Sequence, residues 1–376
     1  MTVFMKEVVT TYAMSLTGTN YEIGYQLGQE VLKQPALLAL HKQKKTNFSP
    51  KELISAIRLF DQWCPGLTAE LTGFADALNV TAHEIFFYSM TYLIPRCSQI
   101  VILPNRNADN IPLLARNYEF SAKSEDFCIM KTAVKGRYAH IGTSVLHFGR
   151  DEGLNEQGLA VSMSSSGFPV GALNYMRKPK FKGLQFWAVI RTLLENCRNV
   201  DEALTFLAEM PIAYNINLML VDKSGKAALY ETLDGRTQSQ VIDAESFNQV
   251  LFATNHPLFA SLRQIEPEIT VHSAKRYEYI AKKLKNENKV SRAMLKEMLV
   301  ANYPAGLCCH FFQEYFGTTK SMILSPTKRE VEILWGGEVS NGWQKYSFEK
   351  SFTTDQRQIF YHNEKAPKGT FEWVNN

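Results

Sequence analysis

The apolar positions of the chain change their spacing near residue 97. Before that point they recur at helical intervals, as in Leu53, Ile57 and Phe60 after the capping box Ser49-Pro50-Lys51-Glu52. We therefore expect a helical N-terminal segment, residues 1–96. Its helices should begin at residue 50, at residue 67 and at a second capping box, Thr81-Ala82-His83-Glu84, with the last running toward Tyr92 and ending near Pro95.

After residue 97 the chain is dominated by short β-branched and aromatic runs separated by Asn, Asp and Gly, which is typical of strands. We expect strands at residues 98–103, 113–118, 127–134, 139–146, 159–163, 217–221, 227–232, 321–324 and 331–335, the last two forming a hairpin. Helices should occupy residues 184–196 and 273–284, with another capped by Asn199 and Glu202. Periodicity alone thus predicts a mixture of α and β structure in one compact unit.

Composition narrows the range of functions. The 376 residues are 45% hydrophobic and carry 41 basic and 37 acidic side chains, so the chain should be globular with a small positive charge. The basic clusters are short and helix-like, which argues against a nucleic-acid partner. No stretch approaches the roughly 18 apolar residues that span a bilayer, and no signal segment opens the chain, so we expect a cytoplasmic protein with no membrane partner.

Known cofactor and metal motifs are missing. The sequence has no G-x-x-x-x-G-K-[ST], H-E-x-x-H or G-x-S-x-G, and no G-x-G-x-x-G after a predicted strand, so we expect no cofactor. Cys308-Cys309-His310 has no second pair at metal-binding spacing, and we expect it to pack in the core. The six cysteines lack a disulfide-like pattern and should be reduced and mostly buried.

An ordered set of motifs begins where the spacing changes. They are Pro95-Arg96-Cys97-Ser98, Arg116-Asn117-Tyr118-Glu119, Gly153-Leu154-Asn155-Glu156-Gln157-Gly158, Thr254-Asn255-His256-Pro257, and Ser273 followed by Arg276. Their order resembles the N-terminal-nucleophile hydrolases of the acyl-coenzyme A:6-aminopenicillanate acyltransferase group, relatives of choloylglycine hydrolases and acid ceramidase. The glycine-punctuated residues 18–28 resemble the opening of that group. The resemblance implies an α+β fold, the four-layer αββα sandwich with two stacked antiparallel sheets.

The resemblance also implies that Cys97 is the nucleophile and that the chain cuts itself between Arg96 and Cys97. Residues 1–96 would then form a small subunit packed on the catalytic domain, residues 97–376, as a heterodimer of fragments that could assemble further into a homo-oligomer. An N-terminal cysteine carries its own base, because an α-amino group has a pKa of about 7.7–8.0 and a thiol one of about 8.5. Arg96 departs from the glycine that often precedes the cysteine in the acyltransferases.

Four further residues match positions of that group. Arg116 would favour the thiolate, and Glu119, which is aspartate in many relatives, would orient the new α-ammonium group. Asn255 would donate to the oxyanion, a contact worth roughly 3 kcal/mol, and Arg276 matches an arginine near the nucleophile. A surface pair for Arg116 and Glu119, a turn asparagine and a solvated arginine are the structural alternatives.

Two other segments have simpler explanations. Asn155 lies in a glycine-rich turn and should be structural. Some bile-salt-cleaving relatives have a second oxyanion asparagine where this chain has Ser164-Ser165-Ser166-Gly167, which argues against bile-salt hydrolysis, although a backbone N–H of this segment could serve the oxyanion.

The predicted function is hydrolysis or acyl transfer at a linear carbon–nitrogen amide bond or a thioester of a small N-acyl substrate, through an acyl-enzyme on Cys97. Two alternatives stay open at this point. One is an unprocessed, catalytically silent relative that acts as a binding protein. The other is a papain-like Cys/His amidase with His256 as the base.

Overall fold

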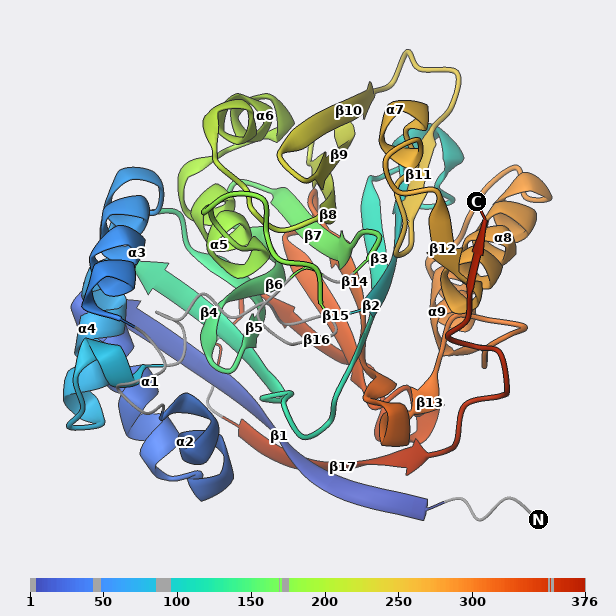
Figure 1. Cartoon of the computed structure of the whole chain (residues 1–376). Helices are drawn as coiled ribbons and strands as arrows, with labels where there is room; N and C mark the ends of the chain where they lie inside the picture. The colour runs from blue at the N-terminus through green and yellow to red at the C-terminus, as the bar shows by residue number, and fades with distance from the viewer. Residues whose placement is uncertain are drawn as a thin grey trace.

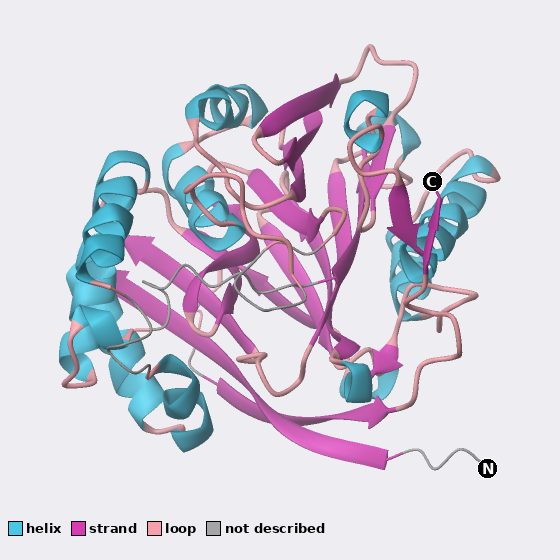
Figure 2. Cartoon of the chain, in the orientation of Figure 1, coloured by secondary structure: helices cyan, strands magenta, loops and turns pink. Residues whose placement is uncertain are grey.

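The computed structural model describes residues 5–42, 49–85, 96–168, 170, 176–350, 352 and 355–375. Within these segments the strands form two large sheets, and helices lie outside both (Figures 1 and 2). The first sheet contains β1 (Met5–Gly18), β4 (Cys128–Val134), β5 (His140–Val145), β6 (Phe148–Asn155), β7 (Leu159–Ser165), β8 (Ile216–Asp222), β9 (Ala227–Leu233), β10 (Arg236–Ile242) and β17 (Asp355–Asn363). The second contains β2 (Arg96–Ile102), β3 (Leu113–Phe120), β11 (Val250–Ala253), β13 (His310–Phe311), β14 (Phe316–Ser325), β15 (Glu330–Trp335) and β16 (Gln344–Ser347).

In the described part of the chain the first sheet has nine strands, in the order β10-β9-β8-β7-β6-β5-β4-β1-β17. The second has seven, in the order β11-β2-β3-β14-β15-β16, with β13 paired to β14. Their neighbouring strands are antiparallel except for β1 and β4, which run parallel. A separate small pair joins β12 (Glu268–Thr270) to β18 (Trp373–Asn375).

Three apolar clusters hold four layers together. The helices are α1 (Asn20–Leu32), α2 (Pro35–His41), α3 (Pro50–Trp63), α4 (Leu67–Ala77), α5 (Phe186–Asn196), α6 (Val200–Glu209), α7 (Ala260–Arg263), α8 (Val271–Lys285) and α9 (Arg292–Val300). One cluster packs α1 and α3–α6 against the nine-stranded sheet, and another packs α8 and α9 against the seven-stranded sheet. The third lies between the sheets and includes Val101, Leu154 and Met322. This is the predicted α+β, αββα sandwich.

The N-terminal segment corrects one expectation. Residues 5–18 form strand β1 and not a helix, and β1 lies inside the sheet between β4 and β17. Its β-branched and aromatic run, Val8-Val9-Thr10-Thr11-Tyr12, is a strand signal that the prediction of a helical prefix did not use.

The other local predictions hold where the structure describes them. Both hydrogen bonds of the capping box at Ser49 and Glu52 are present at the start of α3, and Asn199 caps α6. The helix predicted after Thr81 is an exception: only one 3₁₀ turn forms, Ala82–Glu84, and Ile85 is already extended and bridges to Lys42. The rest of that predicted helix, residues 86–95, lies outside the described residues. None of the described helices combines the length and apolar character needed to cross a bilayer.

Candidate active site

Cys97 is the second residue of β2, an interior strand flanked by β11 and β3. Side chains alternate along a strand, so Cys97 shares a face with Val101, which packs in the core between the sheets. Ser98 points to the other face, where α8 lies. The Cys97 side chain has no exposed surface. In the intact chain the thiol is therefore sealed inside the sandwich.

Arg116 lies on β3 and reaches the sulfur. Gln99 is its partner across the β2–β3 ladder, so the guanidinium extends along the same face toward Cys97. Its Nη2 atom lies 3.0 Å from Cys97 Sγ. The other nitrogen, Nη1, donates to the carbonyl of Asp151 at 3.0 Å and pairs with Glu152 Oε2 at 2.8 Å. The fork of the guanidinium is thus shared between the nucleophile candidate and the opposite sheet.

Asn255 reaches Cys97 through strand pairing. Ala253 of β11 pairs with Gln99 of β2, and two more residues in the same antiparallel register bring Asn255 beside Cys97. Its Oδ1 atom accepts the Cys97 backbone N–H at 3.2 Å and Arg276 Nη2 at 2.7 Å. Two donors on one side of the amide identify that side as the oxygen. The amide nitrogen donates instead to the Ser165 carbonyl at 3.0 Å.

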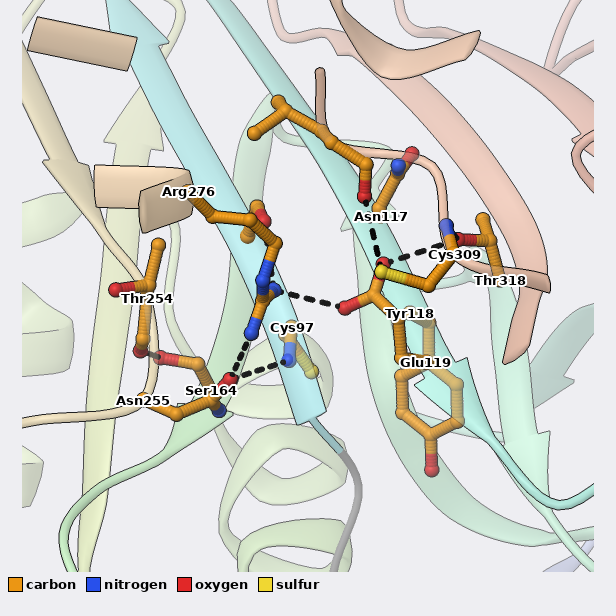
Figure 3. Close-up of polar contacts among 12 residues, drawn as sticks. Cys97, Asn117, Tyr118, Glu119, Ser164, Thr254, Asn255, Arg276, Cys309 and Thr318 are labelled. Carbon is orange, nitrogen blue, oxygen red and sulfur yellow. Dashed lines mark hydrogen bonds and ion pairs between the residues drawn. The ribbon is translucent and has the colours of Figure 1, made fainter. Parts of the chain in front are cut away.

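Arg276 joins the remaining site residues from α8 (Figure 3). Its Nη1 atom donates to Glu119 Oε2 at 3.0 Å and to Ser98 Oγ at 2.8 Å. Thr318 donates to the other oxygen of Glu119 at 3.2 Å. Within the described residues no hydrogen bond joins Glu119 to the Cys97 nitrogen, which is held by Asn255. Glu119 therefore contacts the nucleophile region through Arg276.

Burial dominates the electrostatics of the site. It raises the pKa of the Cys97 thiol to about 12, although Arg116 and Arg276 oppose the shift. It also raises the pKa of Glu119 to about 7 against the same two arginines. Burial alone would lower the pKa of Arg116, but Glu152 raises it above its usual value. The uncut chain thus holds a neutral thiol beside a permanently charged guanidinium.

The structure brings together the predicted residues Cys97, Arg116, Glu119, Asn255 and Arg276, with Arg96 next to Cys97 in β2. The structural alternatives of a surface pair and a solvated arginine are wrong, because Arg116, Glu119 and Arg276 have no exposed surface. Their catalytic roles stay predictions.

His256 lies apart from the sulfur in its hydrogen bonding. Its Nδ1 atom lies 2.8 Å from Ser273 Oγ and 3.3 Å from Thr254 Oγ1, and among the described residues no hydrogen bond joins the ring to Cys97. Burial lowers the pKa of His256 to about 4. This arrangement disfavours a Cys97–His256 pair.

Asn155 and the serine-rich segment 164–167 lie near the ends of β6 and β7. Asn155 is structural as predicted: its side chain donates to the Leu194 and Cys197 carbonyls at the tip of the β6–β7 hairpin. The backbone N–H groups of Ser166 and Gly167, which were candidates for the oxyanion, already donate to the carbonyls of Asn215 and Asn255.

All six cysteines lie in described segments and are free and buried. They include Cys309, which packs with Tyr303, Phe311 and Phe316.

Sequence reasoning missed the acidic support of Arg116. Asp151 and Glu152 directly precede the glycine-rich motif at Gly153, and both are buried. Asp151 also pairs with the buried Lys320 at 2.9 Å. Two adjacent acids between the predicted strands 139–146 and 159–163 were an available signal once they are known to be buried, since buried carboxylates need partners. Their partners lie on the other sheet and have no local sequence signature.

A small hollow opens beside the partner of Asn255. Its volume is about 10 Å³, room for roughly one water-sized molecule, and it is lined by Ser165, Ser166, Gly167, Phe168, Val170, Tyr214 and Asn215. It therefore reaches the residue that accepts the Asn255 amide, Ser165.

Two facing sheets between helical layers, with a cysteine on an interior strand beside an arginine, form the fold of the N-terminal-nucleophile hydrolases. The chain belongs to the acyl-coenzyme A:6-aminopenicillanic acid acyl-transferase family, whose sequence pattern matches residues 106–339. The match contains Arg116, Glu119, Asn255 and Arg276 and begins after Cys97. No curated protein is significantly similar to the chain in sequence.

Solved structures with a similar arrangement include a mutant form of conjugated bile acid hydrolase from Clostridium perfringens. It is 13% identical, with a TM-score of 0.45 over 72% of this chain and 99% of that one. Penicillin V acylase from Agrobacterium tumefaciens is 16% identical, with a TM-score of 0.42 over 68% of this chain and 87% of that one.

Proposed function

We propose that this protein is an autoprocessing cysteine hydrolase or acyltransferase that acts on linear carbon–nitrogen amide bonds or acyl thioesters through an acyl-enzyme on Cys97. One observation carries the proposal, the pair of contacts at Cys97. A guanidinium lies 3.0 Å from its sulfur and an amide oxygen lies 3.2 Å from its backbone nitrogen. The first contact favours a thiolate, and the second would hold a free α-amino group next to it.

Activation requires the Arg96–Cys97 bond to break. The Cys97 sulfur attacks the Arg96 carbonyl carbon and forms a thioester, while the carbon–nitrogen bond breaks and the thiol proton passes to the departing nitrogen, which becomes the α-amine. Water then hydrolyses the thioester: its oxygen stays on Arg96 as part of a carboxylate, one of its protons goes to the sulfur, and the other is released. Residues 1–96 become the small subunit and residues 97–376 the catalytic chain.

The new amine supplies the base that the uncut chain lacks. While the Arg96–Cys97 bond is intact, its peptide nitrogen is too weak a base to deprotonate the thiol for attack on a substrate, and the buried thiol is neutral because its pKa is raised to about 12. A free α-amino group with a pKa of about 7.7–8.0 can accept that proton near neutral pH. Asn255 Oδ1 would orient this amine, and Arg276 would fix Asn255 while Glu119 neutralises Arg276.

In a turnover the sulfur attacks the carbonyl carbon of the substrate while the amine takes the thiol proton. The amine then returns the proton to the leaving nitrogen or thiol, and the acyl group stays on Cys97 as a thioester. Water or an acceptor amine attacks this thioester and restores the cysteine. The family's description, which names an acyl-coenzyme A and an aminopenicillanic acid, supports a small acyl thioester or acyl amide as substrate.

Intact-mass measurement under denaturing conditions tests the proposal. The wild type should give two chains, the larger beginning at Cys97, and should be labelled by a thiol-directed acyl probe. Cys97→Ala should give one unlabelled chain. A single wild-type chain that the probe does not label would contradict the proposal and favour the silent binding protein.

The same preparation separates the proposal from the papain-like alternative. His256→Ala should lower activity only moderately, because Ser273 and Thr254 are the hydrogen-bond partners of this ring in the described part of the chain. Complete loss of acyl labelling in processed, folded His256→Ala would instead support His256 as the base.

A further inference from the structure

A buried ion pair links the two sheets directly behind the Cys97 sulfur. Arg116 belongs to β3 of the seven-stranded sheet and Glu152 to β6 of the nine-stranded sheet, and neither side chain has exposed surface. Their atoms Nη1 and Oε2 lie 2.8 Å apart. The same guanidinium holds the Cys97 sulfur at 3.0 Å through Nη2. One positive charge therefore faces two competing acceptors.

Glu152 is itself fixed in place. The hydroxyl of Thr143, on the neighbouring strand β5, donates to Glu152 Oε1. The adjacent backbone carbonyl, that of Asp151, accepts a second bond from Arg116 at 3.0 Å. Two consecutive residues of β6 therefore hold the guanidinium. It cannot rotate away from the sulfur without breaking its contacts with the Asp151 carbonyl and the Glu152 carboxylate.

We propose that Glu152 is a positioning residue that sets the charge state of Cys97 through Arg116. This inference rests on the proposed function, since it matters only if Cys97 is the nucleophile. The carboxylate neutralises the guanidinium in the resting site, which keeps the thiol protonated until the α-amine takes its proton. It also aims the fork of Arg116 so that Nη2 meets the sulfur.

The other charged groups around Cys97 pair with one another. Arg276 of α8 and Glu119 of β3 pair with each other at 3.0 Å. Asp151 pairs with Lys320 of β14 at 2.9 Å, and Lys320 also pairs with Glu125. Of the carboxylates that act on the thiol, Glu119 is bound to a different arginine, so Glu152 is the one that competes directly for Arg116.

Glu152→Gln provides the test, because glutamine keeps the size of the side chain next to Arg116 while the negative charge is gone. In the processed enzyme, the pH dependence of Cys97 alkylation and of kcat/KM for an N-acyl amide should shift by about one unit toward lower pH. Alkylation well below the thiol pKa should then be about ten times faster than in the wild type. The alkylated Cys97 peptide is followed by mass, which separates it from the other cysteines.

A matched control is Glu195→Gln. It removes a buried carboxylate from an arginine, Arg191, that keeps Glu70 as a second partner, and it should leave both pH profiles unchanged. Thr143→Val is a second variant for the case in which Glu152→Gln does not fold. Loss of the hydroxyl leaves the Glu152 charge less satisfied, so the profiles should move toward higher pH.

If the processed, active wild type and Glu152→Gln have the same pH profiles of alkylation and kcat/KM, the role of Glu152 is overturned and the proposed function stands. If Glu152→Gln does not fold, identical profiles for the wild type and Thr143→Val lead to the same conclusion. A wild type that is neither cut nor labelled would overturn the proposed function. In that case alkylation of Cys97 in the uncut chain, followed against pH by the mass of the Cys97 peptide, still decides the charge effect: faster alkylation of Glu152→Gln at the same pH supports it and equal rates contradict it.

Discussion

Arg276 donates to Asn255 Oδ1 at 2.7 Å, and that same oxygen accepts the backbone N–H of Cys97. The relationship changes the role that sequence reasoning gives to Asn255. An amide whose oxygen faces the nitrogen of Cys97, and whose NH₂ donates to Ser165, would orient an amine at that position if the chain is cut before Cys97. Its predicted oxyanion donation stays a prediction and would require the NH₂ to leave Ser165.

Asn255→Asp and Asn255→Ala distinguish these roles. Aspartate keeps an oxygen acceptor for the Cys97 amine and for Arg276, whereas alanine removes both contacts. If Asn255 orients the amine, the aspartate variant should retain much more acylation rate than the alanine variant. Single-turnover acylation of processed protein measures this. Equal losses of about a hundredfold or more in both variants would instead favour oxyanion donation through the NH₂.

Arg116→Lys tests whether the guanidinium fork is needed. A lysine ammonium is a single point charge and cannot reach Cys97 Sγ, Glu152 and the Asp151 carbonyl in the planar geometry that arginine uses. We expect acylation to fall by about a hundredfold or more, with slower self-cleavage. Arg198→Lys on the exposed pair with Glu202 is the control and should have no effect. Near-wild-type rates for Arg116→Lys would show that charge alone suffices.

Glu231 makes stability depend on pH. Its carboxylate accepts the backbone N–H groups of Leu258 and Phe259, just after the segment that carries Asn255. Burial nevertheless raises its pKa from 4.5 to about 7. Because the folded state favours the protonated form, this contribution to stability is complete below pH 4.5 and is lost as the pH rises through 7.

Glu231→Gln cannot ionise and should escape this loss. Relative to the wild type, its free energy of unfolding should rise by about 3 kcal/mol between acidic and mildly alkaline pH, since each pKa unit corresponds to about 1.4 kcal/mol. Urea denaturation at several pH values measures the difference, with the exposed Glu245→Gln as control. A difference that does not change with pH would contradict the predicted titration.

Local signals in the sequence predicted much of the fold but only part of the site. The capping box at Ser49 and the cap at Asn199 are set by neighbours within four residues, and both are present. Arg116 and Glu119 were predicted as site residues from the family resemblance, and the pairing of their strand with β2 places them near Cys97. Asn255 and Arg276 required the family resemblance, since β11 and α8 reach Cys97 only through long-range pairing.

The support from Glu152 could not be predicted from spacing. It depends on how the two sheets stack, which is no property of either strand alone. The structure also explains how a glutamate can stand at position 119, where many relatives have aspartate. The longer side chain reaches Arg276, which in turn holds Asn255, so the carboxylate acts at one remove from the Cys97 nitrogen.

The fragment of residues 1–96 should stay bound after cleavage. Its strand β1 is hydrogen-bonded on both edges, to β4 and β17, and its helix α4 contributes the fully buried Glu70. Both oxygens of Glu70 accept from Arg191 of α5, at 3.0 and 2.7 Å. Native mass measurement of the processed protein should therefore give one particle that contains both chains.

Glu70→Gln should weaken that association, because Arg191 loses one of its two carboxylates inside the core. Removing one partner of a buried ion pair costs about 3–5 kcal/mol, and the remaining Glu195 should reduce this cost for Arg191. The small subunit should then be released at a lower urea concentration, measured by size-exclusion chromatography. Glu30→Gln, which breaks only the exposed pair with Lys33, should leave the release unchanged. Equal release from Glu70→Gln and the wild type would mean that β1 alone holds the fragment.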